Sequence, residues 1–453
     1  MHFTLEAVPD DSLLFDIIKH WHKEERDTFG VELVEVFLMR IHSLVLRMII
    51  ALVAATLCGS EQRVVSGVPL QDRAATQTKV ATIPIEIDSE NYVFMKARIN
   101  GSEPLTFEID SGAGSGLVLY FQAAERLGLK PQGKGKGSGG GESTFDTSFV
   151  KDVSLSFEGV EISNQKLVVF PPERTRRASD RVVDGIIGYA LFSRYAVEVD
   201  YESRVVNLYE PKTYQYSGSG VSIPIKVMSN VPFARVTIPV AGKPLDGEFI
   251  VDMGAGRFTL ILNTPLVESR NLLAVAQKTI EELGAQGVGG NVKLLVGRLP
   301  RVQLGSFTFS NPVIYLAQDR KGVFASSEFS GVIGGELLGR FKVIFDYAHK
   351  RMYLEPNSHL ADAFEYDMSG IRMEVEGENR KTFRVKRVAE NSPAFEAGVR
   401  QGDVLLAVDG KPAAELSLSR INQMFKQEGK EHVLEIVSGE KTKQIKFNSR
   451  RLI

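Results

Sequence analysis

The sequence predicts a mainly β protein in which one domain is duplicated and a smaller domain follows. Two stretches, "GSEPLTFEIDSGAGSGLVLY" from 101 and "GKPLDGEFIVDMGAGRFTLIL" from 242, share a Pro-Leu pair, an apolar strand pattern and an Asp-x-Gly-Ala-Gly turn. Two later stretches, "GIIGYALFSRYAVEVDY" from 185 and "GVIGGELLGRFKVIFDY" from 331, match in the same order. The Asp residues of the two turns are 142 residues apart, and the two later stretches begin 146 residues apart. A solenoid repeat is only about 20 to 50 residues long, so this repeat indicates a duplicated domain.

The first copy begins with the pattern of a β-hairpin. Residues 92–99 and 105–109 are the two strands, and Asn100-Gly101 supplies the positive φ that a tight hairpin turn needs. A short helix is predicted at 121–127, shortly after the Asp-containing turn.

The second copy repeats this order. Its hairpin strands are predicted at 233–240 and 249–251, and Thr264 is predicted to cap a helix whose first turn accepts Pro265. A Gly/Ser-containing linker at 214–220 separates the copies. The predicted segments are an N-terminal extension at 1–38, a signal peptide at 39–60, the first repeat at 78–213, the second repeat at 220–357 and a third domain at 368–450.

The signal peptide is predicted from an uncharged apolar run at 48–58, which follows Arg40 and Arg47. The run is shorter than the roughly 20 apolar residues of a membrane span, although a buried helix would give the same pattern. Translation that starts at Met39 would place this signal at the N-terminus, so residues 1–38 are interpreted as an extension. We therefore expect an exported, periplasmic or cell-envelope protein. Attachment of a lipid to Cys58, and hence membrane anchoring, stays open.

The composition excludes several classes of function. Lys and Arg number 54 and Asp and Glu 56, so the net charge of −2 argues against a nucleic-acid partner. The single cysteine excludes a disulfide framework and a multi-cysteine metal site. Histidine is scarce, with 7 residues and no HExxH motif. We expect neither a metal nor an organic cofactor.

The two Asp-containing turns carry the candidate chemistry. Asp110 and Asp252 each end an apolar strand, and two such turns facing each other would bring two carboxylates together. Such a pair holds one proton between its members and titrates as a unit. The ionised member can take a proton from water while the protonated member donates to a carbonyl oxygen, which is what metal-free amide hydrolysis requires. One such turn alone would be equally well explained as a plain turn.

Over roughly 80–356, these motifs resemble the retropepsin-like aspartic proteases, and most of all the bacterial group with two copies in one chain. The resemblance implies a bilobed acid-protease β-barrel pseudo-dimer. It also implies that Asp110 and Asp252 form a catalytic dyad that cleaves proteins or peptides. The supporting residues implied in and behind the catalytic loops are Ser111, Gly112, Met253, Gly254, Gly188 and Gly334. The flap residues implied are Gly139, Gly140, Gly289 and Gly290.

The sequence departs from the family at one position of the motif. The family has Thr or Ser after each Asp, and this chain has Ser111 in the first copy but Met253 in the second. The missing hydroxyl keeps two alternatives to an active single-chain endopeptidase open. One is a catalytically impaired fold that acts as a peptide-binding or scaffolding module. The other is a homodimer that pairs Asp110 of two chains.

The third domain resembles the PDZ domain, in the permuted form of bacterial exported proteases, over 388–410 and through the string "SPAFEAGVRQGDVLLAVDGK" at 392–411. The resemblance implies that the backbone N–H groups at Gly370 and Ile371 hold the carboxylate of a peptide C-terminus. The peptide would then add as a strand beside Ile371. The facing helix is expected at 419–426, where Ile421 and Phe425 could line the groove or fill the core.

Overall fold

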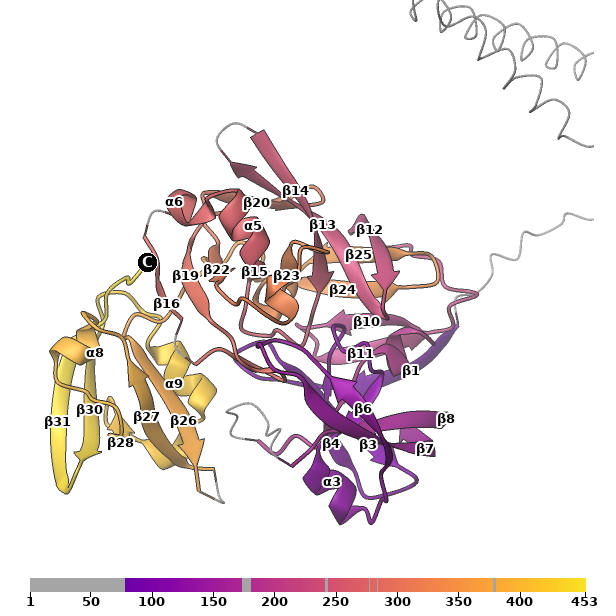
Figure 1. Cartoon of the computed structure of the whole chain (residues 1–453), viewed down its shortest axis with the longest axis horizontal. Coiled ribbons are helices and arrows are strands. Elements are labelled where there is room, and N and C mark those ends of the chain that lie inside the picture. Colours follow the sequence, from indigo (N-terminus) through magenta and orange to yellow (C-terminus); the bar gives the residue numbers. More distant parts are fainter. Residues whose placement is uncertain (1–77, 173–180, 241–242, 277, 283, 378–379) are drawn as a thin grey trace, which may run out of the picture. The chain divides into compact units, whose positions relative to one another are not determined.

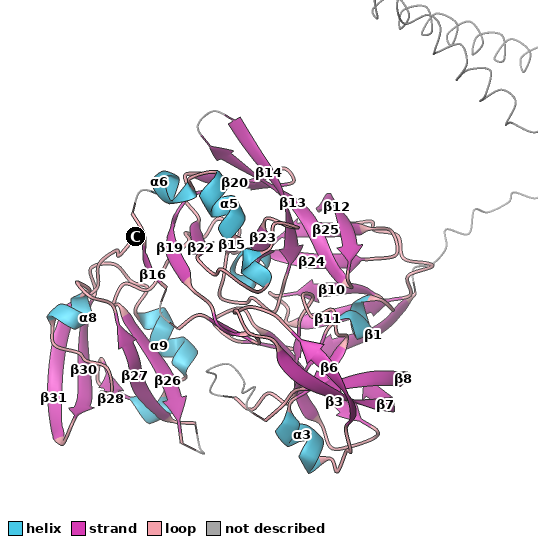
Figure 2. Ribbon diagram, in the orientation of Figure 1, coloured by secondary structure: helices cyan, strands magenta, loops and turns pink. Residues whose placement is uncertain are grey.

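The computed structural model describes residues 78–172, 181–240, 243–276, 278–282, 284–377 and 380–453. The prediction of a mainly β fold is confirmed, because strands dominate this part of the chain (Figures 1 and 2). Its helices are short, and none of those described is long and apolar enough to cross a membrane. The predicted extension and signal peptide, at 1–38 and 39–60, lie outside the described residues, as does Cys58.

The first copy forms an eight-stranded sheet in the order β2-β3-β4-β9-β5-β8-β7-β6. Its strands are β2 (Glu86–Ile87), β3 (Val93–Ile99), β4 (Leu105–Ile109), β5 (Leu117–Leu119), β6 (Gln132–Gly137), β7 (Phe145–Phe157), β8 (Val160–Val169) and β9 (Gly185–Ile187). β3 and β4 form a hairpin whose turn residues Asn100 and Gly101 have φ values of +51° and +72°. Helix α3 (Phe121–Arg126) follows β5, and α4 (Tyr189–Phe192) follows β9.

The second copy repeats the arrangement. Its strands are β13 (Val231–Val240), β14 (Lys243–Val251), β15 (Leu260–Leu262), β16 (Ile280–Glu281), β17 (Gln286–Gly287), β18 (Gly290–Asn291), β19 (Leu294–Arg298), β20 (Arg301–Leu304), β21 (Phe307–Ser310), β22 (Val313–Ala317) and β23 (Gly331–Ile333). Its helices are α5 (Thr264–Ser269), α6 (Leu272–Ala276), the 3-10 turn η1 (Val323–Ala325) and α7 (Gly335–Leu338).

The predicted cap of α5 is wrong by one residue. The helix begins at Thr264, so Asn263 is its N-cap, and no side chain caps it. The Thr264 hydroxyl donates instead to the buried carbonyl of Asp319 (2.9 Å).

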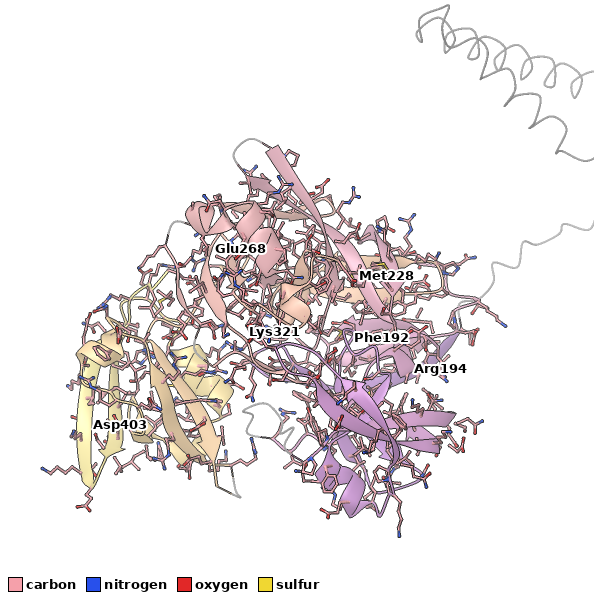
Figure 3. The ribbon with its side chains drawn as sticks, viewed as in Figure 1. Phe192, Arg194, Met228, Glu268, Lys321 and Asp403 are labelled. Carbon is pink, nitrogen blue, oxygen red and sulfur yellow. The ribbon has the colours of Figure 1, made fainter. Side chains whose placement is uncertain are left out.

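Six strands join the two copies in the order β1-β11-β10-β24-β25-β12. They are β1 (Lys79–Pro84), β10 (Ala196–Asp200), β11 (Val205–Tyr209), β12 (Val221–Met228), β24 (Phe341–Asp346) and β25 (Arg351–Pro356). β10 and β24 occupy equivalent places in the repeat and pair antiparallel, with Val199 opposite Val343. This pairing relates the copies by an approximate two-fold axis. Phe192, which is labelled in Figure 3, packs edge-on against Phe345 across the junction, with 5.1 Å between the ring centroids.

The PDZ-like domain has its own sheet, in the order β26-β27-β28-β30-β31, with β29 beside β28. Its elements are β26 (Ile371–Glu376), β27 (Thr382–Val388), α8 (Pro393–Glu396), β28 (Val404–Val408), β29 (Lys411–Pro412), η2 (Ala413–Glu415), α9 (Leu418–Met424), β30 (Glu431–Ser438) and β31 (Lys441–Asn448). Ile421 and Phe425 are 0% and 1% exposed and belong to the core of this domain, which decides between the groove and core alternatives.

Candidate active site

Asp110 and Asp252 each follow a buried strand that lies beside a second, short strand. β4 pairs in parallel with β9, which pairs antiparallel with β5. β14, β23 and β15 repeat this arrangement in the second copy. The Asp110 N–H donates to the Ile187 carbonyl (3.0 Å), and the Asp252 N–H donates to the Ile333 carbonyl (2.9 Å). The short strands therefore hold both Asp-containing turns from behind.

Gly188 and Gly334 follow these short strands where two backbones approach closely. A Cβ on Gly188 would overlap the carbonyl oxygens of Ala113 and Asp110, and one on Gly334 would overlap the carbonyl oxygen of Ala255. Glycine is therefore required at both positions, because any side chain would push the short strand away from the turn.

The carboxyl group of each Asp lies against the glycine of the opposite turn. A Cβ on Gly112 would lie only 2.6 Å from the Asp252 Cγ, and a Cβ on Gly254 would overlap the Asp110 carboxyl group. The Gly112 N–H also donates to the Asp110 Oδ1 (2.7 Å). One chain thus brings together the two aspartates that its sequence repeats, and the two glycines leave the space that the carboxyl groups fill.

A single hydroxyl joins the two turns. The buried Ser111 Oγ donates to the Val251 carbonyl (2.7 Å) and accepts from the Met253 N–H (3.0 Å). Met253 is fully buried and packs into the hydrophobic core. Its thioether cannot form the equivalent hydrogen bonds to the first copy, because it has no donor and its sulfur is only a weak acceptor. Hydroxyl hydrogen bonds between the turns are therefore made from the first copy, and apolar packing of Met253 replaces them in the second copy.

The glycine-rich hairpins of the two copies contact each other. The Ser143 N–H donates to the Gly289 carbonyl (3.0 Å), and the Gly289 N–H donates to the Gly140 carbonyl (2.8 Å). Gly139 lies against the hairpin of the second copy. Gly290 has a φ of +110°, which favours glycine. The four predicted flap glycines thus lie where the tips of these two hairpins meet.

Sequence reasoning missed Tyr347, whose pKa is influenced by the charges of both candidate aspartates. The Tyr347 hydroxyl is buried and has no hydrogen-bond partner among the described residues. Burial raises the pKa of Tyr347 well above its ordinary value, and the negative charges of Asp110 and Asp252 raise it further. The phenol therefore stays protonated and can act as a donor. The one signal in the sequence is that Tyr201 and Tyr347 end the two later repeat stretches.

The predicted carboxylate-binding loop of the third domain is bonded within the chain. The Gly370 N–H donates to the Asp367 Oδ2 (2.6 Å), and the Ile371 N–H donates to the Ser369 Oγ (3.0 Å). Burial raises the pKa of Asp367 to about 6, although the hydrogen bonds from Ser369 and Gly370 oppose this shift. The Asp367 carboxylate lies in the loop that the PDZ resemblance assigns to a peptide carboxylate, and sequence reasoning missed it.

No group of three His, Cys, Asp or Glu side chains within the described residues could hold a metal ion. Arginine and carboxylate side chains line the cavities, and two of them form a buried pair. Arg257 follows the second Asp-containing turn and contacts Glu282 at 2.7 Å, with the two side chains 13% and 2% exposed.

Comparison with known proteins gives matches to two family models. An aspartyl protease family matches residues 95–191, which include Asp110 and the short strand behind it. A PDZ domain family matches residues 369–448. A search of curated proteins found no match.

Solved structures also resemble this chain at low sequence identity. An aspartic proteinase from Irpex lacteus is 14% identical, with a TM-score of 0.41, and the match covers 62% of this chain and 98% of that one. Basic 7S globulin from soybean is 12% identical, with a TM-score of 0.37, and the match covers 63% of this chain and 97% of that one. From the two family matches, the chain combines a retropepsin-like aspartyl protease domain with a C-terminal PDZ domain.

Proposed function

We propose that this protein is an exported aspartic endopeptidase in which Asp110 and Asp252 activate water, and in which the PDZ domain recognises peptides. The observation that carries the proposal is the crossed arrangement of the two Asp-containing turns in one chain. Each carboxyl group lies against the glycine of the opposite turn, and a backbone hydrogen bond from a short strand holds each Asp from behind.

Two adjacent carboxyl groups that share one proton can hydrolyse an amide without a covalent intermediate. The ionised member takes a proton from water as the oxygen attacks the carbonyl carbon, and the protonated member donates its proton to the carbonyl oxygen. The resulting diol then collapses. Its C–N bond breaks as the nitrogen takes up a proton from the protonated member and the ionised member takes a proton from a diol hydroxyl. A carboxylic acid and an amine then leave, and the dyad again holds one proton.

The glycine-rich hairpins suit a peptide substrate. Their tips are held together by two backbone hydrogen bonds, at Ser143 and Gly289. As the flaps that the family resemblance implies, these hairpins would open to admit an extended peptide, and their closure afterwards would exclude bulk water from the reacting groups. Gating of this kind favours cleavage within a chain that passes beneath the hairpins.

Met253 favours a second candidate function. If the missing hydroxyl misaligns the dyad enough to stop turnover, the protease fold would serve as a peptide-binding or scaffolding module. The retained bonds of Ser111 to Val251 and Met253 support the active form over this alternative.

The test of the proposal is cleavage of a denatured-protein mixture by the purified protein, with and without a hydroxyl-bearing transition-state mimic. We expect cleavage that the mimic blocks and that Asp110→Asn abolishes in a folded protein. Cleavage that Asp110→Asn leaves intact would rule out the dyad. A folded parent protein with no cleavage would support the binding-module alternative.

Export is a separate part of the proposal, supported by the apolar run at 48–58. The intact mass of the protein recovered from the cell envelope tests it. We expect the mature chain to begin near residue 60, and an unprocessed chain retained in the cytoplasm would contradict export. A mature chain that instead begins at Cys58, with a mass increase on that residue, would show lipid anchoring.

A further inference from the structure

The groove of the PDZ domain already holds a carboxylate from the protease part of the same chain. The PDZ resemblance implies that a peptide binds in a groove between β26 and α9, and both elements are labelled in Figure 1. The Asn422 Nδ2 of α9 donates to the Glu90 Oε1 (3.0 Å). Arg372 of β26 lies 3.9 Å from the same oxygen, and the side chain of Glu90 is only 20% exposed. Glu90 therefore contacts both walls of the groove.

The groove is positively charged where Glu90 lies. Burial alone would raise the pKa of Glu90, but the charges of Arg372, Arg257 and Lys426 and the hydrogen bond from Asn422 outweigh it and hold the pKa below its ordinary value. Arg372 and Lys426 belong to the PDZ domain, so they would remain for another carboxylate if Glu90 left.

Glu90 is presented to the groove by a fixed turn. The Asp88 Oδ1 accepts from the N–H groups of Glu90 and Tyr92, at 3.0 Å each. The Asn91 Nδ2 donates to the Glu336 Oε2 (3.0 Å) on α7. A turn that is already ordered loses little conformational freedom when it binds, which makes Glu90 an effective internal ligand.

The groove opens on a cavity with room for more than one side chain. This cavity of about 650 Å³ lies between the PDZ domain and the protease part, and its lining includes Glu90, Asn422 and Lys426 as well as the loop residues Gly370 and Ile371. A peptide whose C-terminus replaced Asp367 at the loop could therefore place a second carboxylate where Glu90 lies now.

We propose that the PDZ domain selects peptides that carry an acidic side chain near a free C-terminus, and that Glu90 of the same chain competes with them for Arg372, Lys426 and Asn422. This inference rests on the proposed role of the PDZ domain in peptide recognition and deepens it, because it names the ligand class and the internal competitor.

The test is a fluorescence-anisotropy titration of the full chain, in an Asp110→Asn background so that no probe is cleaved. The probes are labelled peptides of about ten residues in three pools: one with Glu among the last residues, one with Gln in its place, and one with Glu and a C-terminal amide. We expect the Glu pool to bind more tightly than the Gln pool and the amidated pool.

Two variants separate the groove from the rest of the junction. Glu90→Ala removes the carboxylate from the groove and should tighten binding of the Glu pool about tenfold. The peptide then no longer has to displace the charge-assisted contacts of Glu90. Glu281→Ala is the matched control: Glu281 pairs with Arg387 of the PDZ domain at 2.9 Å, but the two side chains are 60% and 46% exposed. It should leave binding within about twofold. Arg372→Gln should make the Glu and Gln pools bind equally well. This variant tests the groove even if Glu90→Ala does not fold.

The outcomes separate the inference from the proposed function. Equal binding of the Glu and Gln pools, or equal tightening by Glu90→Ala and Glu281→Ala, would overturn the inference while leaving peptide recognition intact. Absence of binding for every pool in every variant would overturn peptide recognition by the PDZ domain as well.

Discussion

The two Asp-containing turns share one backbone arrangement but differ in how they are tied together. Both aspartates receive a hydrogen bond from a short strand behind them, and both lie against a glycine of the other turn. Only the first copy supplies a hydroxyl, because Ser111 is matched by Met253. Backbone hydrogen bonds and glycines therefore place the two carboxyl groups. The turns stay together although only one of them supplies a hydroxyl.

The largest expected effect comes from the glycines, where the copies are alike. Gly112→Ala would put a methyl group in the place of the Asp252 carboxyl, and Gly254→Ala would do the same to Asp110. We expect each change to lower kcat/KM at least about a hundredfold, as misplaced reacting groups do. Steady-state kinetics on one cleavable peptide measures this. Retention of activity by either folded variant would contradict the crossed arrangement.

The second largest effect is expected from removal of the Ser111 hydroxyl, which only the first copy has. Ser111→Ala would leave the Met253 N–H and the Val251 carbonyl buried without their shared partner. We expect a loss of about 1 to 3 kcal/mol in the free energy of unfolding and about tenfold in kcat/KM. Urea unfolding and peptide cleavage report the two quantities. Ser111→Thr keeps the hydroxyl, so a similar loss in that control would mean that the side-chain volume matters instead.

Restoring the second hydroxyl should have a smaller effect. Met253→Thr could donate and accept between the turns, but it gives up buried packing by a side chain that fills apolar gaps well. We expect kcat/KM to stay alike or to rise by up to about tenfold, with the parent already active. Gain of activity from an inactive parent would identify a silenced protease. Loss of activity in a folded variant would show that the methionine has another role.

The smallest effect concerns the tyrosines that end the repeat. Burial and the charges of both aspartates raise the pKa of Tyr347, whereas burial alone raises the pKa of Tyr201. We expect Tyr347→Phe to lower kcat about threefold with little change in KM, because one nearby donor is lost. Tyr201→Phe is the matched control and should leave kcat unchanged. Equal effects of both changes would place the role in packing at the junction.

Much of the protease fold follows from repetition in the sequence. Two Asp-x-Gly-Ala-Gly turns and two apolar-apolar-Gly strands predict a duplicated β domain, and Asn100-Gly101 predicts the first hairpin turn. Thr264 shows the limit of local patterns. It is a good capping residue, but its hydroxyl is used by the distant carbonyl of Asp319, so the helix begins at Thr264 itself. A partner 55 residues away in the chain leaves no mark near the helix.

The candidate sites were predictable only where a motif repeats. Asp110 and Asp252 stand out because each stands in the same pattern. Tyr347, Asp367 and Glu90 act through neighbours that folding brings to them, and a lone carboxylate or phenol has no pattern of its own. The assignment of Gly370 and Ile371 to a peptide carboxylate stays a prediction.

The central claim is that one chain supplies both catalytic aspartates. The most direct test is the peptidase activity of Asp252→Asn, measured over a wide range of protein concentrations beside the parent. The account predicts an active parent whose specific activity does not depend on concentration, and a folded variant that is inactive throughout. Activity in Asp252→Asn that rises with protein concentration would contradict it, because two chains would then be pairing Asp110 with Asp110.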